Sequence, residues 1–423
     1  MPPFYRFVPS LLRETADFRR LWLGQTVSVF GDEVGRIAVP LVAVLVLGAD
    51  AAEMGSLTAA GLLPHLLFSL AAGVWLDRVR RRLRVMIWAD VGRALLVATV
   101  PIAHVLGALT IAQLYIVTFL VGSLTVAFDL SWNTVFVSVV RRDRFVDAQA
   151  LLHGSRSLAY VGGPSIGGIL VQVLGAPLAV AADAISFLGS AVFLRRIESP
   201  EPEVEPETGS LRERLMVGLR FVATDPIVRP VLLSAATINL FNLAFTALVI
   251  LYATTQLGVS PGALGLALGS GAVGGLLGAA IAARVGRRIG LGPAYALGCV
   301  LFPLPLVLIP VADPSLPMPV ILALLFGSEF GAGLGVMILD INVGAILSAR
   351  YPDRIRSRAV GAFRFVNYGI RPIGALLGGA LGTLIGVREA LFVTSVAAAL
   401  GILWLIRSRV LRLRDLPEAA PDA

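Results

Sequence analysis

The chain has 423 residues, of which 57% are hydrophobic and 15% are charged, and its formal net charge is +8. A soluble domain carries about 25% charged residues, so this composition excludes an ordinary soluble enzyme. The single cysteine, Cys299, excludes a disulfide framework and a cysteine-based zinc site, and the histidines lack metal-ligand spacing. We therefore expect no metal and no cofactor. Apart from the histidines, the basic residues are all arginines, and most lie in short loops between apolar runs, where membrane topology explains them better than a nucleic-acid partner does.

Apolar runs of about 20 residues recur along almost the whole chain, and each can cross the ~30 Å hydrocarbon core of a bilayer. We predict an all-α polytopic membrane protein with twelve transmembrane helices and no cleaved signal peptide. The predicted spans are 19–47, 54–76, 84–106, 111–140, 146–172, 176–195, 228–256, 261–284, 290–311, 318–347, 358–385 and 387–407.

The loops between these spans alternate in charge. Residues 78–84, 141–144, 284–288 and 350–358 are rich in arginine, whereas in the alternate set only the last loop carries one, Arg388. Cytoplasmic loops carry an excess of basic residues. The pattern therefore predicts that both termini and the central loop are cytoplasmic.

A polar segment divides the chain into two halves of similar length. Residues 198–207 are acidic and proline-rich, which predicts an unstructured linker. After it, Leu211, Leu215, Leu219 and Val222 recur at helical spacing, which predicts an amphipathic helix on the inner leaflet. We predict four parts: a six-helix bundle in residues 1–196, a linker in 197–225, a second six-helix bundle in 226–410 and a cytoplasmic tail in 411–423.

The two halves look like copies of one unit. A single offset of 208 positions joins Arg156 to Arg364, Tyr160 to Tyr368 and Pro164 to Pro372. Several matches at one offset, in corresponding spans, predict an internal repeat. Two parallel repeats of six spans, related by pseudo-symmetry, are the plan of one large transporter fold.

The segment 154–168 in the fifth span is apolar, glycine-rich and interrupted by Pro164. Glycines at this density allow another helix to approach at backbone distance. Proline removes a backbone donor and weakens the helix locally. The segment therefore predicts a kinked, tightly packed helix at an interface that moves.

Two motifs resemble the major facilitator superfamily, and the resemblance covers essentially the full length. Residues 73–82 look like its cytoplasmic loop G-x-x-x-D-R-x-G-R-[KR], with Arg80 in place of a glycine. The fifth span matches G-x(8)-G-P-x-x-G-G, which in that superfamily marks exporters that work as proton antiporters. The matching residues are Gly154, Gly163, Pro164, Gly167 and Gly168. Residues 183–187 and 218–222 resemble the macrolide-efflux and siderophore-exporter branch.

The resemblance implies a role in gating for the loop after the second span. Its residues are Gly73, Asp77, Arg78 and Arg81, with Asp129 in the fourth span as the acidic partner of the arginine. In the superfamily, the aspartate of this loop caps a helix of the other half and stabilises the outward-open state. The alternative is that these charges only set topology and form salt bridges.

A few ionisable residues lie at membrane depth, where an unpaired charge costs ~2.5–3.5 kcal/mol. Asp32 and Glu33 lie near the middle of the first span, and Glu329 lies ~17 Å into the tenth at 1.5 Å per residue. Asp32 and Glu33 face ~100° apart, so they hardly share one cavity. Arg36 is spaced to pair with Asp32, which leaves Glu33 for the cavity, or the two acids exchange roles.

Burial favours the protonated form of a carboxylic acid. Asp32, Glu33 and Glu329 are therefore candidate proton sites in a central cavity. Arg156 either pairs with Asp129 or a first-span acid, or contacts the substrate. The resemblance also implies which spans flank the cavity, and on that basis Phe30, Phe241, Phe245 and Tyr368 are candidate lining residues.

Together these patterns predict a secondary active transporter, a proton-coupled antiporter that exports amphipathic small molecules or drugs by alternating access. The alternative is export of a siderophore or other self-made metabolite, or a non-transporting receptor on the same fold. No histidine cluster, paired metal ligands or nucleotide loop indicates an enzyme. We expect a monomer in the bacterial inner membrane, with protons, a small-molecule substrate and lipid as its partners.

Overall fold

The computed structural model describes residues 9–76, 81–199 and 211–420, with the backbone alone for 69–76 and 211–214. Within these residues the chain forms helices and no strands. The first half contains α1 (Ser10–Glu14), α2 (Ala16–Leu45), α3 (Ala51–Leu76), α4 (Arg82–Val105), α5 (Ile111–Val139), α6 (Phe145–Leu174) and α7 (Ala176–Arg195). The second half contains α8 (Leu211–Thr224), α9 (Val228–Leu251), α10 (Pro261–Ile289), α11 (Leu291–Leu301), α12 (Leu308–Val311), α13 (Met318–Arg350), α14 (Arg356–Ile385), α15 (Val387–Ala399) and α16 (Leu403–Ile406).

Ten helical segments of the described chain are long and apolar enough to cross a membrane. α2 and α3, with 30 and 26 residues, complete a set of twelve. The middle of α2 carries the charged residues Asp32, Glu33 and Arg36. The predicted all-α fold with twelve transmembrane helices is confirmed.

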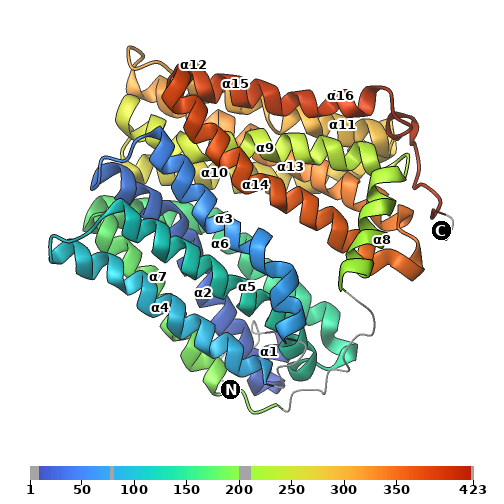
Figure 1. Cartoon of the computed structure of the whole chain (residues 1–423), viewed down its shortest axis with the longest axis horizontal. Helices are drawn as coiled ribbons and strands as arrows, with labels where there is room; N and C mark the ends of the chain where they lie inside the picture. Colours follow the sequence, from blue (N-terminus) through green and yellow to red (C-terminus); the bar gives the residue numbers. More distant parts are fainter. Residues whose placement is uncertain (1–8, 77–80, 200–210, 421–423) are drawn as a thin grey trace.

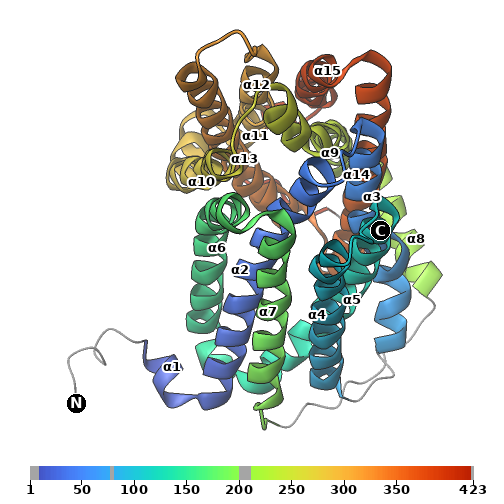
Figure 2. The ribbon, with the colours of Figure 1, turned by 90° about the vertical axis from the view of Figure 1, so that its left-hand side faces the viewer.

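The spans form two bundles that diverge from one another (Figure 1). α2 to α7 pack together in the first bundle, and α9 to α16 pack together in the second. The bundles meet along two seams, one between α6 and α10 and the other between α3 and α14. Figure 2 shows both pairs of helices side by side.

Pairs of glycines allow the backbones to touch at both seams. A Cβ added at Gly168 of α6 would lie 2.9 Å from Cα of Gly265 in α10. A Cβ added at Gly55 of α3 would lie 2.7 Å from Cα of Gly379 in α14. Gly168 and Gly379 are 211 positions apart, and Gly55 and Gly265 are 210 apart, so the two seams are equivalent in the repeat.

The connecting turns carry the same repeat. Gly48 and Gly258, 210 positions apart, have φ values of +68° and +66°. Gly175 and Gly386, 211 positions apart, have φ values of +84° and +96°. A left-handed backbone is readily adopted only by glycine. The two halves therefore place the same residue type at the same two turns, although few side chains match.

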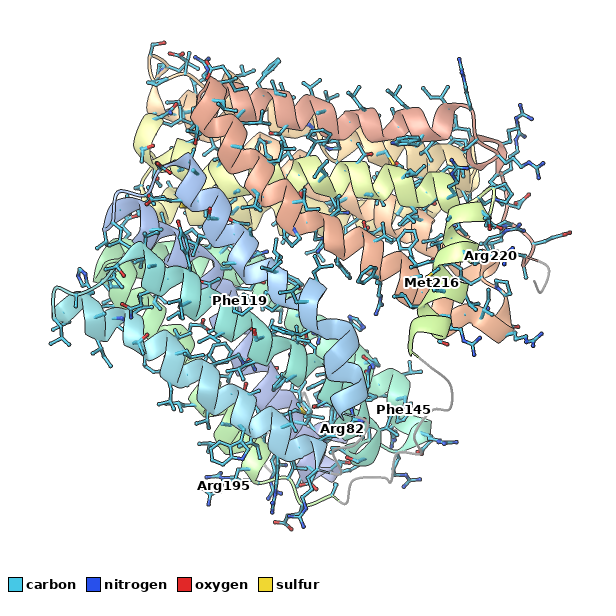
Figure 3. The ribbon with its side chains drawn as sticks, in the orientation of Figure 1. Arg82, Phe119, Phe145, Arg195, Met216 and Arg220 are labelled. Atoms are coloured by element: carbon cyan, nitrogen blue, oxygen red, sulfur yellow. The ribbon has the colours of Figure 1, made fainter. Side chains whose placement is uncertain are left out.

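The seams close the molecule at one end only. Arg82, Arg195 and Arg350 mark one end of the helices, here called the arginine-rich end. The touching glycines lie in the opposite halves of their helices, whereas a Cβ added at Gly154 or Gly361 would meet nothing within 4 Å. In Figure 3 the labelled Arg82 and Arg195 lie at the lower end of the first bundle, and Arg220 lies at the right-hand end of the second. The bundles are thus joined at the arginine-poor end and apart at the arginine-rich end.

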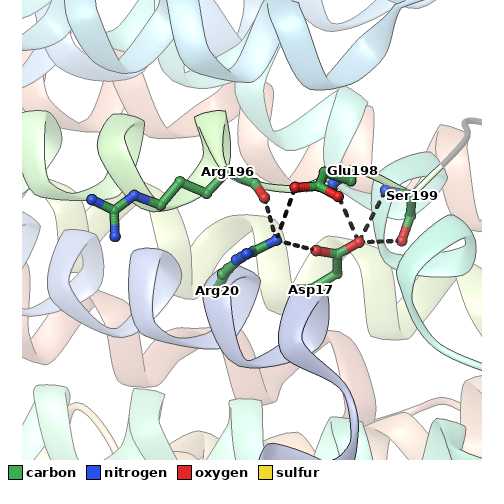
Figure 4. A network of polar contacts seen from close by, with 5 residues as sticks. All are labelled: Asp17, Arg20, Arg196, Glu198 and Ser199. Atoms are coloured by element: carbon green, nitrogen blue, oxygen red, sulfur yellow. Dashed lines mark hydrogen bonds and ion pairs between the residues drawn. The ribbon is translucent and has the colours of Figure 1, made fainter.

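The segment between the bundles is attached to both. Asp17, at the start of α2, accepts hydrogen bonds from the amide and hydroxyl of Ser199 at 2.9 and 2.6 Å, and pairs with Arg20 at 2.8 Å (Figure 4). Farther along, Asp225 caps the start of α9 and pairs with Arg350 at 2.8 Å. These contacts fix the two ends of the linker, one on each bundle.

The predicted amphipathic helix is α8, and part of it packs on the second bundle. Val222 is 1% exposed and packs with Phe221 in the core of the second bundle. A Cβ at Gly218 would overlap the carbonyl of Arg358, so α8 lies directly on α14. Packing on α14 thus covers part of the apolar surface of α8, whereas Met216 and Val217 stay exposed.

Candidate functional site between the two bundles

The first charged group of the site lies on α2. The Glu33 side chain is 8% exposed, and its Oε2 lies 2.5 Å from Nη2 of Arg36. The structure thus pairs Arg36 with Glu33 and not with Asp32, which is the alternative in which the two acids exchange roles. Residues three apart on a helix are neighbours just as residues four apart are. Glu33 is held in place by α6, because a Cβ at Gly163 would overlap its Cβ.

Glu329 of α13 faces this pair from the other bundle. Among the described residues, Arg36 supplies the charge that acts on Glu329. Its Oε2 lies 3.5 Å from the position of a Cβ added at Gly271, so it packs against α10. Glu33, Arg36 and Glu329 are here called the acid–arginine–acid set, which has members in both bundles beside the α6–α10 seam.

Asp32 belongs to a different group, inside the first bundle. Its side chain is exposed, and the charges that act on it are those of Arg93, Asp90, Asp129 and Glu33. It also acts on the buried Asp183 of α7. The side chains of the adjacent residues Asp32 and Glu33 thus lie in two different environments, because neighbouring residues on a helix point ~100° apart.

Arg93 is the cation at the centre of that second group. It is 2% exposed, pairs with the fully buried Asp90, and donates to Oγ1 of Thr125 at 3.4 Å. Its guanidinium lies between two aromatic rings, 4.7 Å from the centroid of Phe128 and 4.3 Å from that of Phe187. The arginine is therefore locked by packing as well as by charge.

A third charged group lies beside the α3–α14 seam. His65 of α3 is exposed, and the charges that act on it are those of Asp129 in α5 and Arg371 in α14. The sequence analysis did not single out His65, although its position in the middle of the second span was a usable signal. Arg371 is in turn the charge that acts on Asp340 of α13.

The predicted partner of Arg156 is near it but not in contact. Arg156 is half-buried on α6, and its charge acts on Asp129, which His65 and Arg93 also influence. Of the gating-loop residues, Arg81 precedes α4 and is exposed. Asp77 and Arg78 lie outside the described residues, as do the surroundings of Gly73. The latch therefore stays a prediction.

The fifth-span motif packs α6 on two different neighbours. Gly163 lies against Glu33, and a Cβ at Gly167 would lie 3.1 Å from Cα of Val34, so both positions face α2. Gly168 instead faces α10, and a Cβ at Gly265 would overlap the carbonyl of Pro164. The motif thus links the acid–arginine–acid set to the seam between the bundles.

The four candidate lining aromatics differ in exposure. Tyr368 is 45% exposed, with Arg371 over its ring, and Phe241 is half-buried. Phe30 lies 3.7 Å from a Cβ added at Gly162. Phe245 is only 2% exposed and packs in the main core, so in this structure it does not line the space between the bundles.

Among the described residues no group of three or more His, Cys, Asp or Glu side chains is arranged to hold a metal ion. A pocket of about 270 Å³ lies at the arginine-poor end, where Asp50, Thr255 and Thr383 are among its lining residues. It is separate from the three charged groups, which lie deeper along the helices.

Comparisons with known proteins agree with this architecture. The family model described as "transmembrane secretion effector" matches residues 9–421. The multidrug efflux pump Tap of Mycolicibacterium fortuitum is 27% identical over 410 residues, covering 92% of this chain and 94% of Tap. Tap of Mycobacterium tuberculosis is 28% identical over 420 residues, covering 93% of each.

Solved structures share the fold. A bacterial homologue of the lysosomal transporter Spinster, inward-facing and unoccupied, has a TM-score of 0.73 at 14% identity and covers 96% of this chain. A bacterial homologue of the iron transporter ferroportin, also inward-facing, has a TM-score of 0.74 at 17% identity and covers 94%. With a family model matched over nearly its full length, the chain belongs to the transmembrane secretion effector family of major facilitator transporters.

Proposed function

We propose that the chain is a proton-coupled antiporter that exports amphipathic small molecules, drugs among them, across the bacterial cell membrane by alternating access. One observation carries the proposal. In the middle of the membrane-spanning helices, Arg36 is paired with Glu33 of its own bundle, and its charge also acts on Glu329 of the other bundle. The full-length relatives named as multidrug efflux pumps support the substrate class.

The direction of transport follows from the orientation. Basic loops face the cytoplasm, so the arginine-rich end is the cytoplasmic end and both termini lie there. Because the bundles are apart at that end, the polar groups between them are open to the cytoplasm. A substrate enters from the inside, and closing of that end with opening of the glycine seams releases it outside.

Competition at Glu329 couples the two movements. The ionised carboxylate attracts Arg36 and the cationic part of a substrate. A proton bound to the same carboxylate removes that attraction, so proton and substrate exclude one another. Two ligands that compete for one site are carried in opposite directions when the site alternates between the two faces.

The test uses purified protein in proteoliposomes and ethidium as the substrate. We expect an imposed pH gradient to drive ethidium into an acidic lumen. Glu329→Gln should lower the gradient-driven uptake by at least about tenfold, within the range typical of coupling between two ligands. Glu33→Gln should have the same direction of effect, because it releases Arg36.

Glu53→Gln is the matched control. This acid lies at the arginine-poor end, where its Oε2 accepts the amide of Asp50 at 3.0 Å, far from the set between the bundles. It should transport as the parent does. The proposal would be contradicted if ethidium uptake by the parent did not depend on the pH gradient, or if Glu329→Gln kept the gradient-driven uptake of the parent.

Export of a siderophore or other self-made metabolite is the second candidate. It requires a group that binds anions between the bundles, and Arg371 on α14 is one such group. Iron-limited growth with accumulation of siderophore inside cells that lack the gene would favour it over drug export.

A further inference from the structure

The charged group beside the α3–α14 seam differs from the other two because its cation has no acid in contact. Arg371 is half-buried near the middle of α14. Within the described parts of the chain, no carboxylate oxygen lies within 4.0 Å of its guanidinium, whereas Arg36 and Arg93 each have one. An unpaired charge at membrane depth is costly, so such a group normally has a partner or a function.

Uncharged contacts hold the arginine in one orientation. Its Nε donates to Oδ1 of Asn239 at 2.9 Å, and Nδ2 of Asn239 donates to Oδ1 of Asn367 at 3.0 Å. Its Cζ lies 4.1 Å from the centroid of the Tyr368 ring. These contacts occupy one edge and one face of the guanidinium. The N–H groups on Nη1 and Nη2 make no hydrogen bond to the described residues and remain available to a ligand.

Three ionisable side chains from the first and second bundles lie near Arg371 or near one another. The charges of Asp340 on α13 and His65 on α3 interact with that of Arg371, and the charge of Asp129 acts on His65. All three side chains are exposed. A planar guanidinium with two free nitrogens is suited to bidentate recognition of a carboxylate.

We propose that Arg371 is the anion-binding group of the substrate site and that it takes the carboxylate of a zwitterionic amphiphile whose cationic part faces Glu329. This rests on the proposed function, because it adds a second charged contact to the same substrate. Both contacts belong to the second bundle, Glu329 on α13 and Arg371 on α14, and each lies beside a different seam with the first bundle. Asn239 and Tyr368 act as positioning residues for the guanidinium.

Rhodamine 110 and its methyl ester, rhodamine 123, test the proposal. The two dyes share the cationic ring system, and only rhodamine 110 has a free carboxylate. Binding to purified protein in lipid nanodiscs is measured by fluorescence polarisation, without a pH gradient. Arg371→Gln should weaken the binding of rhodamine 110 by about tenfold or more, as expected for hydrogen bonds between charged groups, and that of rhodamine 123 by less than about threefold.

Two further variants make the result interpretable. Arg371→Lys keeps the positive charge but lacks the paired N–H groups of the guanidinium, so its affinity for rhodamine 110 should lie between those of the parent and of Arg371→Gln. Asn239→Ala should weaken the binding of rhodamine 110 and leave that of rhodamine 123 unchanged. It replaces Arg371→Gln in the test if that variant does not fold. Arg364→Gln, an exposed arginine two turns away on α14, should leave both dyes unchanged.

The anion site would be overturned if Arg371→Gln lowered the affinity for both dyes equally or changed neither affinity. It would also be overturned if the parent did not bind rhodamine 110. A failure of proton coupling would leave this equilibrium measurement unaffected. Conversely, if the pH gradient still drives ethidium transport while Arg371→Gln changes the binding of the two dyes equally, only the anion site is overturned.

Discussion

A buried arginine stabilises the first bundle through charge and packing together. Arg93 is the cation nearest to three acids, Asp90, Asp32 and Asp183. Removing one partner of a buried ion pair leaves an uncompensated charge, which typically costs about 3–5 kcal/mol. The same pair replaced by two neutral residues of similar size costs far less.

We therefore expect Arg93→Met to lower the unfolding temperature in detergent strongly, and Asp90→Asn/Arg93→Met to recover part of the loss. The recovery is partial because Asp32 and Asp183 keep no cation beside them. Intrinsic tryptophan fluorescence during heating measures this. If the double variant is less stable than Arg93→Met, the charge argument is wrong and packing between the two phenylalanines dominates.

Asp313 shows the same physics at the surface, in the loop before α13. Hydrogen bonds from the hydroxyl and amide of Ser315, at 2.6 and 2.9 Å, and the Arg388 guanidinium at 2.7 Å hold the pKa of Asp313 below its ordinary value of 3.8. This explains why a lone arginine is tolerated among the arginine-poor loops, since Asp313 pairs with it.

A lowered pKa in the folded state means that the carboxylate stabilises the fold above its ordinary pKa, and that this contribution is lost as the pH falls through the folded value. Asp313→Asn should therefore lower the unfolding temperature slightly at pH 7, with the difference from the parent closing in acid. Asp415→Asn is the control, because it removes an exposed acid near the end of the described tail. A difference that is constant with pH would show that the charge of Asp313 is irrelevant.

At the scale of elements, one glycine of the fifth-span motif sets how closely two helices approach. A side chain at Gly168 would meet backbone atoms of α10, which cannot move aside as a side chain can. A Cβ at Gly154, in the same motif and helix, would meet nothing within 4 Å. The two positions therefore form a matched pair for testing what closes the seam.

Gly168→Val should open the arginine-poor end and bring the arginine-rich ends together, whereas Gly154→Ala should not affect the seam. Spin labels at Val146 of α6 and Ser357 of α14, both exposed at the arginine-rich end, report the distance between bundles. We expect this distance to shorten in Gly168→Val and to stay at the parent value in Gly154→Ala. An unchanged distance in Gly168→Val would mean that the glycine contact does not hold the bundles in this arrangement.

At the scale of the whole molecule, two equivalent seams define a hinge between the bundles. Backbone contact at Gly55–Gly379 and at Gly168–Gly265 closes one end, and both contacts belong to the repeat. Small residues let helices pack closely without interlocking side chains, so such seams separate more readily than an interdigitated core. The equivalent opening at the other end is what alternating access requires.

Labelling of cysteines from either side of the membrane tests the orientation and the open end together. Tyr160 is 51% exposed on α6, and Ala108 is exposed in the loop after α4 at the arginine-poor end. In a Cys299→Ser background, Tyr160→Cys should react with an impermeant maleimide mainly in inside-out vesicles, and Ala108→Cys mainly in intact spheroplasts. The reverse pattern would place the arginine-rich end outside.

Much of the fold follows from the sequence alone because lipid imposes a simple rule. Every backbone polar group in a bilayer must bond within its own helix, so apolar length and arginine spacing specify the spans and their direction. The predicted span 176–195 coincides with α7, and 84–106 differs from α4 by two residues or fewer at either end. Similarly, several matches at one offset, Pro164 with Pro372 among them, predict the repeat.

The tertiary structure alone decided which charges share a group. Spacing leaves open whether Arg36 pairs with Asp32 or with Glu33, and the structure pairs it with Glu33. Asp32 and His65 interact with groups on other helices, Asp32 with Arg93 of α4 and His65 with Arg371 of the other bundle. Likewise, only packing shows that Phe245 is covered and that α8 lies on α14. Periodicity specifies the face of a helix that is apolar, but it does not specify the element that covers that face, because that depends on contacts between residues far apart in the chain.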